Sequence, residues 1–212
     1  MRWDLDECSR RFEQLCSRAF SPRELYKIPL IRYLVAMKHA AKYKTKPLRE
    51  VLEESFGRDS LFGNDDQNEF TTSRDCSPRV AVTATDETGR RAILLANYSR
   101  QPGSKDGAVA PGYEFARPDR PDLELKIWEA AAATSAAPSY FKPFIHGSTK
   151  RTYLDGALYH NNPVRIAEQE RKLIWPDVAD KHPDILLSVG TSHSGVAREL
   201  SSELSGSKIA LR

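Results

Sequence analysis

The sequence predicts an α/β domain, with helices covering a β-sheet, from three observations. Apolar residues recur at helical spacing in several segments, as at Leu5, Phe12 and Leu15. Two short apolar runs, "RVAVTAT" and "RAILLANYS", are typical of strands. Strand-like and helix-like segments then alternate towards the C-terminus, which is the order expected for a sheet layered against helices.

The first part of the chain is predicted to be helical. Asp4, followed by Glu7 three residues later, resembles a capping box that starts the first helix. Gly57 ends the last of these helices, since glycine tolerates the backbone angles of a helix C-terminus. The expected helices cover residues 3–20, 28–43 and 46–57, and a polar, turn-rich loop follows over 58–78.

A hairpin and a helix are expected next. Residues 79–85 and 91–99 form two strands joined by "DETGR", with Gly89 supplying the turn angle. A long loop covers 100–122. The helix that starts near residue 123 carries only small side chains from Ala130 to Ala137, before Pro138 stops it.

The C-terminal part alternates between strands and helices. A short strand over 151–156 ends at an acid, Asp155. The next helix, 162–175, has Asn162 as its expected cap and Pro163 at its first position. The apolar run 183–191 predicts a buried strand, and a short last helix is expected over 196–204.

Composition excludes several function classes. Of 212 residues, 40% are apolar and 29% charged, which is ordinary for a soluble domain. The net charge is only +3, and the basic residues are scattered among acidic ones, so nucleic acid is not an expected partner. No apolar run approaches the ~18 residues of a spanning helix, and the N-terminus lacks a signal-peptide centre. With neither a spanning segment nor a signal peptide, we expect a cytoplasmic protein. The three cysteines have no metal-like spacing, so no metal or cofactor is expected.

Asp155 is the candidate functional residue. It stands at the carboxyl end of a predicted strand, where α/β sheets place functional groups. Gly156 and Ala157 leave room for a backbone or a substrate to approach. The alternative is that Asp155 only starts a turn, because Asp-Gly is a common turn signal. Close packing alone likewise accounts for the small residues Ala130 to Ala137.

Three motifs in order carry a family resemblance: "WEAAAATSAAPSYFKPF", "TYLDGALYHNNPV" and "DILLSVGTS". Together they resemble the C-terminal part of a patatin-like phospholipase domain, from about Trp3 to Ser192. The resemblance implies a patatin-like layered sheet covered by helices. It also implies a lipid acyl hydrolase with a Ser-Asp dyad, acting on phospholipid or another acyl lipid.

The resemblance assigns one catalytic residue. The family's Asp-Gly-Gly or Asp-Gly-Ala motif matches Asp155, Gly156 and Ala157, so Asp155 is the expected base. A serine hydroxyl is a weak nucleophile until a positioned base takes its proton, and a carboxylate within hydrogen-bond reach can do so.

The nucleophile is the part that the resemblance does not find. In the family the serine lies in a G-x-S-x-G elbow upstream of the matched motifs, and a glycine-rich loop further upstream binds the oxyanion. We therefore expect an incomplete domain over residues 1–195, and a C-terminal segment, 196–212, without a clear stop signal. Ser192 lies in a near-elbow, but because serine replaces its second glycine we expect a strand-end turn residue, with a nucleophile as the alternative. A catalytically inactive remnant that acts through lipid or protein contacts is the rival interpretation.

Two further expectations follow from an incomplete lipid hydrolase. The isolated chain should be destabilised or aggregation-prone, because missing strands leave apolar surface and a sheet edge uncovered. Peripheral contact with membranes is also expected. Its candidates are Phe141, Phe144 and Ile145 beside Lys142, and packing of these side chains in the core is the alternative.

Overall fold

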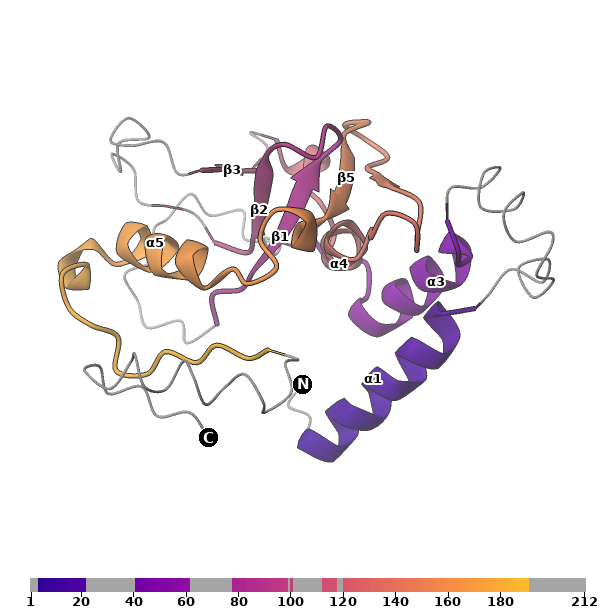
Figure 1. The fold of residues 1–212 in the computed structure, drawn as a ribbon, viewed down its shortest axis with the longest axis horizontal. Coiled ribbons are helices and arrows are strands. Elements are labelled where there is room, and N and C mark those ends of the chain that lie inside the picture. The colour runs from indigo at the N-terminus through magenta and orange to yellow at the C-terminus, as the bar shows by residue number, and fades with distance from the viewer. Residues whose placement is uncertain are drawn as a thin grey trace. The chain divides into compact units, whose positions relative to one another are not determined.

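The computed structural model describes residues 4–21, 41–61, 78–98, 100, 112–117 and 120–190, and its chain forms two compact units, Met1–Asn161 and Asn162–Arg212 (Figure 1). The predicted helices over 28–40 and 196–204, and Ser192, lie outside the described residues. The elements of the first unit are α1 (Leu5–Ala19), α3 (Thr45–Phe56), β1 (Ala81–Asp86), β2 (Ala92–Ala96), β3 (Tyr113–Phe115), η2 (Pro121–Leu123), α4 (Ile127–Thr134), β4 (Phe144–Ile145), β5 (Thr152–Asp155) and η3 (Gly156–Leu158).

The first unit contains a mixed five-stranded sheet, in the order β3-β2-β1-β5-β4. β2 and β3 run parallel, whereas β1 pairs antiparallel with both β2 and β5. The hairpin prediction is confirmed, and Gly89 turns with a φ of 70°. With helices packed on this sheet, the fold is α/β, as the sequence predicted. β3 and β4 were not predicted, because each has only two or three residues and lies in a turn-rich stretch.

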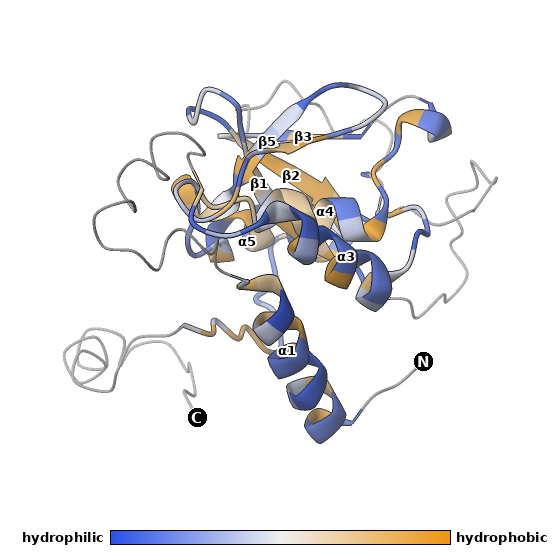
Figure 2. Ribbon diagram, turned by 90° about the vertical axis from the view of Figure 1, so that its right-hand side faces the viewer, coloured by the Kyte–Doolittle hydropathy of each residue, from blue (hydrophilic) through white to orange (hydrophobic). Residues whose placement is uncertain are grey.

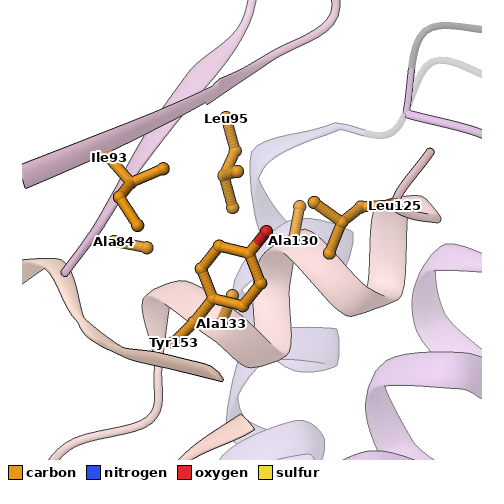
Figure 3. Close-up of a cluster of buried hydrophobic side chains, with 7 residues drawn as sticks. All are labelled: Ala84, Ile93, Leu95, Leu125, Ala130, Ala133 and Tyr153. Carbon is orange, nitrogen blue, oxygen red and sulfur yellow. The ribbon is translucent and has the colours of Figure 1, made fainter. Parts of the chain in front are cut away.

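Helix α4 lies between the sheet and a second helical layer. It contacts β1 and β5 on one side and α3 on the other, and α3 in turn contacts α1 (Figure 1). Figure 3 shows side chains of β1, β2 and β5 directed towards Ala130 and Ala133 of α4. The other side of α4 packs Trp128 and Ala132 against buried residues of α1 and α3. Because α4 is covered on both sides, small residues allow the layers to approach.

Helix α1 is buried only near its C-terminal end. Asp4 caps it by accepting a hydrogen bond from the Glu7 N–H at 2.7 Å, although the Glu7 carboxylate bonds arginines instead of completing a capping box. Figure 2 shows that the ribbon of α1 is mainly hydrophilic, whereas the ribbons of strands β1 and β2 are hydrophobic. Ala19 is buried, whereas Leu5 is 84% and Phe12 is 66% exposed. Much of the predicted apolar stripe therefore has no cover.

The second unit begins with α5 (Val164–Ile174), followed by η4 (Pro176–Val178). The N-cap of α5 is Pro163, so the prediction of Asn162 as the cap and Pro163 as the first helical residue is wrong by one position. The Oδ1 of Asn162 accepts a hydrogen bond from the Val164 N–H at 3.1 Å. At the other end Arg171 donates to the carbonyl oxygens of Val178 and Ala179, at 2.9 and 3.1 Å, and so ties η4 to the helix.

The predicted buried strand over 183–191 is wrong for its described residues, 183–190. They form no strand, and Ile185 and Val189 are 86% and 84% exposed. A strand needs a neighbour to pair its backbone N–H and C=O groups, and an apolar run does not supply one. The stretch is held within its own unit by a 3.1 Å hydrogen bond from the Asn162 side chain to the Ser188 hydroxyl. No helix among the described residues is long and apolar enough to cross a membrane.

Candidate active site

The backbone of Asp155 is held from two other elements. Its N–H donates to the carbonyl oxygen of Ala136 at 3.0 Å, just beyond the end of α4. Its own carbonyl accepts a hydrogen bond from the Thr85 hydroxyl of β1 at 2.8 Å. Asp155 is the last residue of β5 and lies opposite Ala84 of β1 in the antiparallel ladder. The strand end therefore has a defined position relative to both β1 and α4.

The carboxylate of Asp155 has one occupied oxygen. Oδ1 accepts a hydrogen bond from the N–H of Ala157 at 2.7 Å, and this contact begins η3. Within the described part of the chain, no hydrogen bond reaches Oδ2. The first contact is the one expected of a turn-starting aspartate, whereas the second oxygen is available to another group. Asp155 can therefore start a turn through Oδ1 and still act as a functional residue through Oδ2, so the two interpretations from the sequence are compatible.

Gly156 lies directly against β1. A Cβ at this position would be 2.2 Å from the carbonyl oxygen of Thr83 and 2.4 Å from the Thr83 hydroxyl oxygen. The same carbonyl accepts a hydrogen bond from the Thr134 hydroxyl of α4 at 2.7 Å, so it cannot easily move away. The glycine of the Asp-Gly-Ala motif is required here by a close backbone approach.

The alanine-rich segment provides the other wall of this arrangement. α4 ends at Thr134, earlier than the predicted stop at Pro138, and Ser135 follows as its C-cap. Ala133 and Ala136 are 0% and 2% exposed. Because the helix ends early, the carbonyl of Ala136 points away from the helix ladder and can accept the bond from Asp155. Close packing, predicted as one interpretation of these residues, is confirmed.

The other predicted candidates are dispersed. Of the proposed membrane-facing residues, Phe141 is buried and Phe144 half-buried in the core, whereas Ile145 is 60% exposed and Lys142 is exposed. Packing in the core is therefore confirmed for the two phenylalanines alone.

Three threonines next to Asp155 were missed from the sequence: Thr83, Thr85 and Thr134. Thr85 is 0% exposed, so its hydroxyl is buried together with its partner. A signal was present in the run "VTAT", since buried hydroxyls on a strand require hydrogen-bond partners. Sequence alone does not identify which partner they take.

An ion pair lies at the opposite end of β5 from Asp155. Arg151 binds Glu114 of β3 with both guanidinium nitrogens, at 2.7 and 2.8 Å. These hydrogen bonds hold the pKa of Glu114 below its usual value. Arg91 adds a weaker contact with the same carboxylate at 4.0 Å. Among the described residues, no group of three or more His, Cys, Asp or Glu side chains is placed to hold a metal ion.

Comparison with known proteins relates this chain to phospholipases and patatin-like proteins. The sequence model of the patatin-like phospholipase family matches residues 2–168. The chain is 27% identical over 190 residues to calcium-independent phospholipase A2-gamma of Oryctolagus cuniculus, covering 88% of this chain and 21% of that protein. It is 27% identical over 171 residues to the probable inactive patatin-like protein 9 of Arabidopsis thaliana, covering 77% and 38%. A cGAMP-activated phospholipase of Escherichia coli is 28% identical over 151 residues, covering 70% and 35%. The chain thus spans about a fifth of the length of the first of these relatives.

Proposed function

The chain belongs to the patatin-like phospholipase family, and on that premise we propose that it is part of a serine-type lipid acyl hydrolase with Asp155 as the catalytic base. The substrate class is a phospholipid or another acyl lipid, as the names of the phospholipase relatives suggest. The observation that carries the proposal is the Asp155 carboxylate, which is held through Oδ1 at a strand end while Oδ2 has no hydrogen bond among the described residues.

In this proposal the reaction follows serine ester hydrolysis. Oδ2 of Asp155 takes the proton of a serine hydroxyl as the serine oxygen attacks the ester carbonyl of the lipid. The ester bond breaks, the proton passes to the departing alcohol, and an acyl-serine remains. Water then attacks the acyl-serine with the same carboxylate as base, and the fatty acid leaves. No metal or cofactor takes part.

The proposed mechanism needs a nucleophilic serine. None of the 212 residues forms a G-x-S-x-G motif, so the nucleophile has to come from further sequence or from Ser192. Ser192 lies outside the described residues, and its near-elbow has serine in place of the second glycine. We favour a serine from further sequence, with Ser192 as the alternative.

A second candidate function is a catalytically inactive protein that acts through lipid or protein contacts. It is favoured by one observation, the similarity to a relative named as a probable inactive patatin-like protein. The two candidates differ in whether an activated serine exists, and a chemical probe detects that directly.

We also propose a peripheral membrane contact for the segment that follows α4. Tyr140 and Ile145 are 50% and 60% exposed, and Lys142 between them is exposed. An exposed aromatic, aliphatic and basic side chain suits the boundary between lipid headgroups and acyl chains. Sedimentation with phosphatidylglycerol vesicles should be weakened by Ile145→Ser, whereas Val80→Ser, which alters a side chain that is 48% exposed on another segment, serves as the matched control. Equal sedimentation of both variants would remove this contact from the proposal.

The catalytic proposal is tested with a fluorophosphonate probe, which reacts with activated serines, and with hydrolysis of phospholipid vesicles. Both are applied to this chain and to any longer protein that contains it. Asp155→Asn should lower labelling and hydrolysis by about 10³-fold or more, while Asp122→Asn, at an exposed position in η2, should leave them unchanged. Ser192→Ala should abolish labelling and hydrolysis if Ser192 is the nucleophile, and should leave both unchanged if the serine comes from further sequence. Undiminished activity of Asp155→Asn would refute the role of Asp155. A longer protein that folds but is not labelled would favour the inactive candidate, whereas this chain alone is expected to remain unlabelled if the serine lies in further sequence.

A further inference from the structure

Thr85 is fully buried, and its hydroxyl donates to the carbonyl oxygen of Asp155 at 2.8 Å. Its position in the sheet is opposite Leu154, one residue before the candidate base. A buried hydroxyl is unfavourable unless it makes a hydrogen bond. Here the bond is made to the residue on which the proposed chemistry depends.

The orientation of the Asp155 carbonyl decides where the next amides point. Asp155 has a ψ of 136°, and the plane of the peptide that follows rotates with this angle. The N–H that holds the Asp155 carboxylate belongs to Ala157, two residues further on, at 2.7 Å from Oδ1. A hydroxyl that fixes the Asp155 carbonyl therefore also fixes the donor of its carboxylate.

The neighbouring contacts leave little freedom once this bond is present. The N–H of Asp155 is bound to Ala136, and Gly156 lies against Thr83, whose carbonyl is held by Thr134. Of the polar atoms of Asp155, the N–H, the carbonyl and Oδ1 are thus tied within the fold. Because these three groups are held by hydrogen bonds, they also fix the direction in which the remaining oxygen, Oδ2, points.

We propose that Thr85 is a positioning residue, whose buried hydroxyl orients the Asp155 carboxylate so that Oδ2 faces the site where a serine proton would be received. The inference rests on the proposed function, since it takes Asp155 as the base. The physical reason is that small displacements of a catalytic group strongly lower the reaction rate. A shift of about 1 Å in a reacting group can lower a rate by about 10²-fold.

The test compares Thr85→Val, which replaces the hydroxyl by a methyl group of similar size, with Thr85→Ser, which keeps the hydroxyl. The matched control is Thr152→Val, at the other end of β5. The readout on the whole chain is hydrogen exchange of the Ala157 amide, followed by NMR, with the core amide of Leu95 as a measure of overall stability. Thr85→Val should accelerate exchange at Ala157 by about fivefold relative to Leu95, the factor that corresponds to the loss of about 1 kcal/mol for a hydrogen bond of this kind.

Each result has a definite meaning. Thr85→Ser should retain the parent exchange rate, and Thr152→Val should leave Ala157 unchanged. Equal exchange at Ala157 in the parent and in Thr85→Val would overturn the inference, as would a parent in which Ala157 exchanges at the rate of an unfolded chain. If Thr85→Val does not fold, acceleration by Thr85→Ser, which keeps the hydroxyl, would overturn it, while parent-like exchange there and faster exchange in Thr85→Ala would support it.

Failure of this inference is distinguishable from failure of the proposed function. If Asp155→Asn leaves lipid hydrolysis unchanged, the role of Asp155 fails whatever Thr85 does to the Ala157 amide. In a protein that hydrolyses lipid through Asp155, Thr85→Val should lower kcat by about 10²-fold with little change in KM. An equal rise in KM at constant kcat would assign Thr85 to substrate binding and contradict a positioning role.

Discussion

The tripeptide Ile-Leu-Leu occurs twice in this chain, with opposite outcomes. In β2, Ile93, Leu94 and Leu95 are 0%, 2% and 0% exposed. At residues 185–187 the same three side chains are 86%, 46% and 68% exposed. β2 has a strand on each side, β1 and β3, whereas residues 185–187 pair with no strand among the described residues. The comparison teaches that an apolar run acquires a structure from its neighbours.

The largest expected difference is between Gly156, which lies against the sheet, and Gly190, at the end of the exposed stretch. Gly156→Ala should lower the free energy of unfolding by more than about 3 kcal/mol, because its Cβ would overlap the Thr83 carbonyl. Gly190→Ala, where no atom lies within 4 Å of the added Cβ, should change it by less than about 0.5 kcal/mol. Urea unfolding followed by circular dichroism measures both. Equal effects would mean that Gly156 does not lie against β1.

A smaller difference is expected from truncating the matched leucines. Leu95→Ala removes a fully buried side chain between the sheet and α4, and should lower the free energy of unfolding by about 3 kcal/mol. Leu187→Ala should have an effect within about 0.5 kcal/mol. The two variants are compared in the same urea titrations. A large effect of Leu187→Ala would show that this stretch is buried in solution and would remove the contrast.

The smallest expected effect concerns charge and pH. The pKa of Glu114 is lowered by its hydrogen bonds from Arg151, so the stabilisation is present above the unfolded pKa of about 4.3 and is lost as pH falls through the lower folded pKa. Because the carboxylate is about a third exposed, screening limits the contribution to about 1 kcal/mol or less. Glu114→Gln should reduce the loss of stability between neutral and acidic pH.

The matched charge control lies in the second unit. Glu168→Gln removes the partner of Arg171 within α5. Because this pair joins residues three apart on one helix, the variant should alter the pH dependence of unfolding less than Glu114→Gln does. Thermal unfolding at a series of pH values compares the two. A larger effect from Glu168 would mean that the ion pair on the sheet contributes little.

Elements with strong local signals were predicted correctly. Helix α3 ends at Gly57, with a φ of 71°, and the hairpin turns at Gly89. Asp155 was found at the end of its strand, because the change from an apolar run to Asp-Gly is visible in the sequence. These features depend on residues that are adjacent along the chain, or separated by one helical turn.

Features that depend on distant residues were missed or mispredicted. The buried strand over 183–190 was wrong because exposure depends on what covers an apolar run. Thr85 and Thr134 were not identified, because their partners lie 70 and 51 residues away in the sequence. The spacing of Leu5 and Phe12 predicted a helix but not the environment of these side chains, which are exposed.

By itself the sequence determined helices α1, α3, α4 and α5, the hairpin, the Asp-Gly-Ala motif and the family, since each depends on residue types at short spacing. The tertiary structure alone decided which Ile-Leu-Leu is buried and why residue 156 has to be glycine. It also decided that Thr85 and Ala136 hold the backbone of Asp155. The physical reason is that burial, close approach and hydrogen-bond partnership are relations between segments far apart in the chain, and they exist only once those segments have packed together.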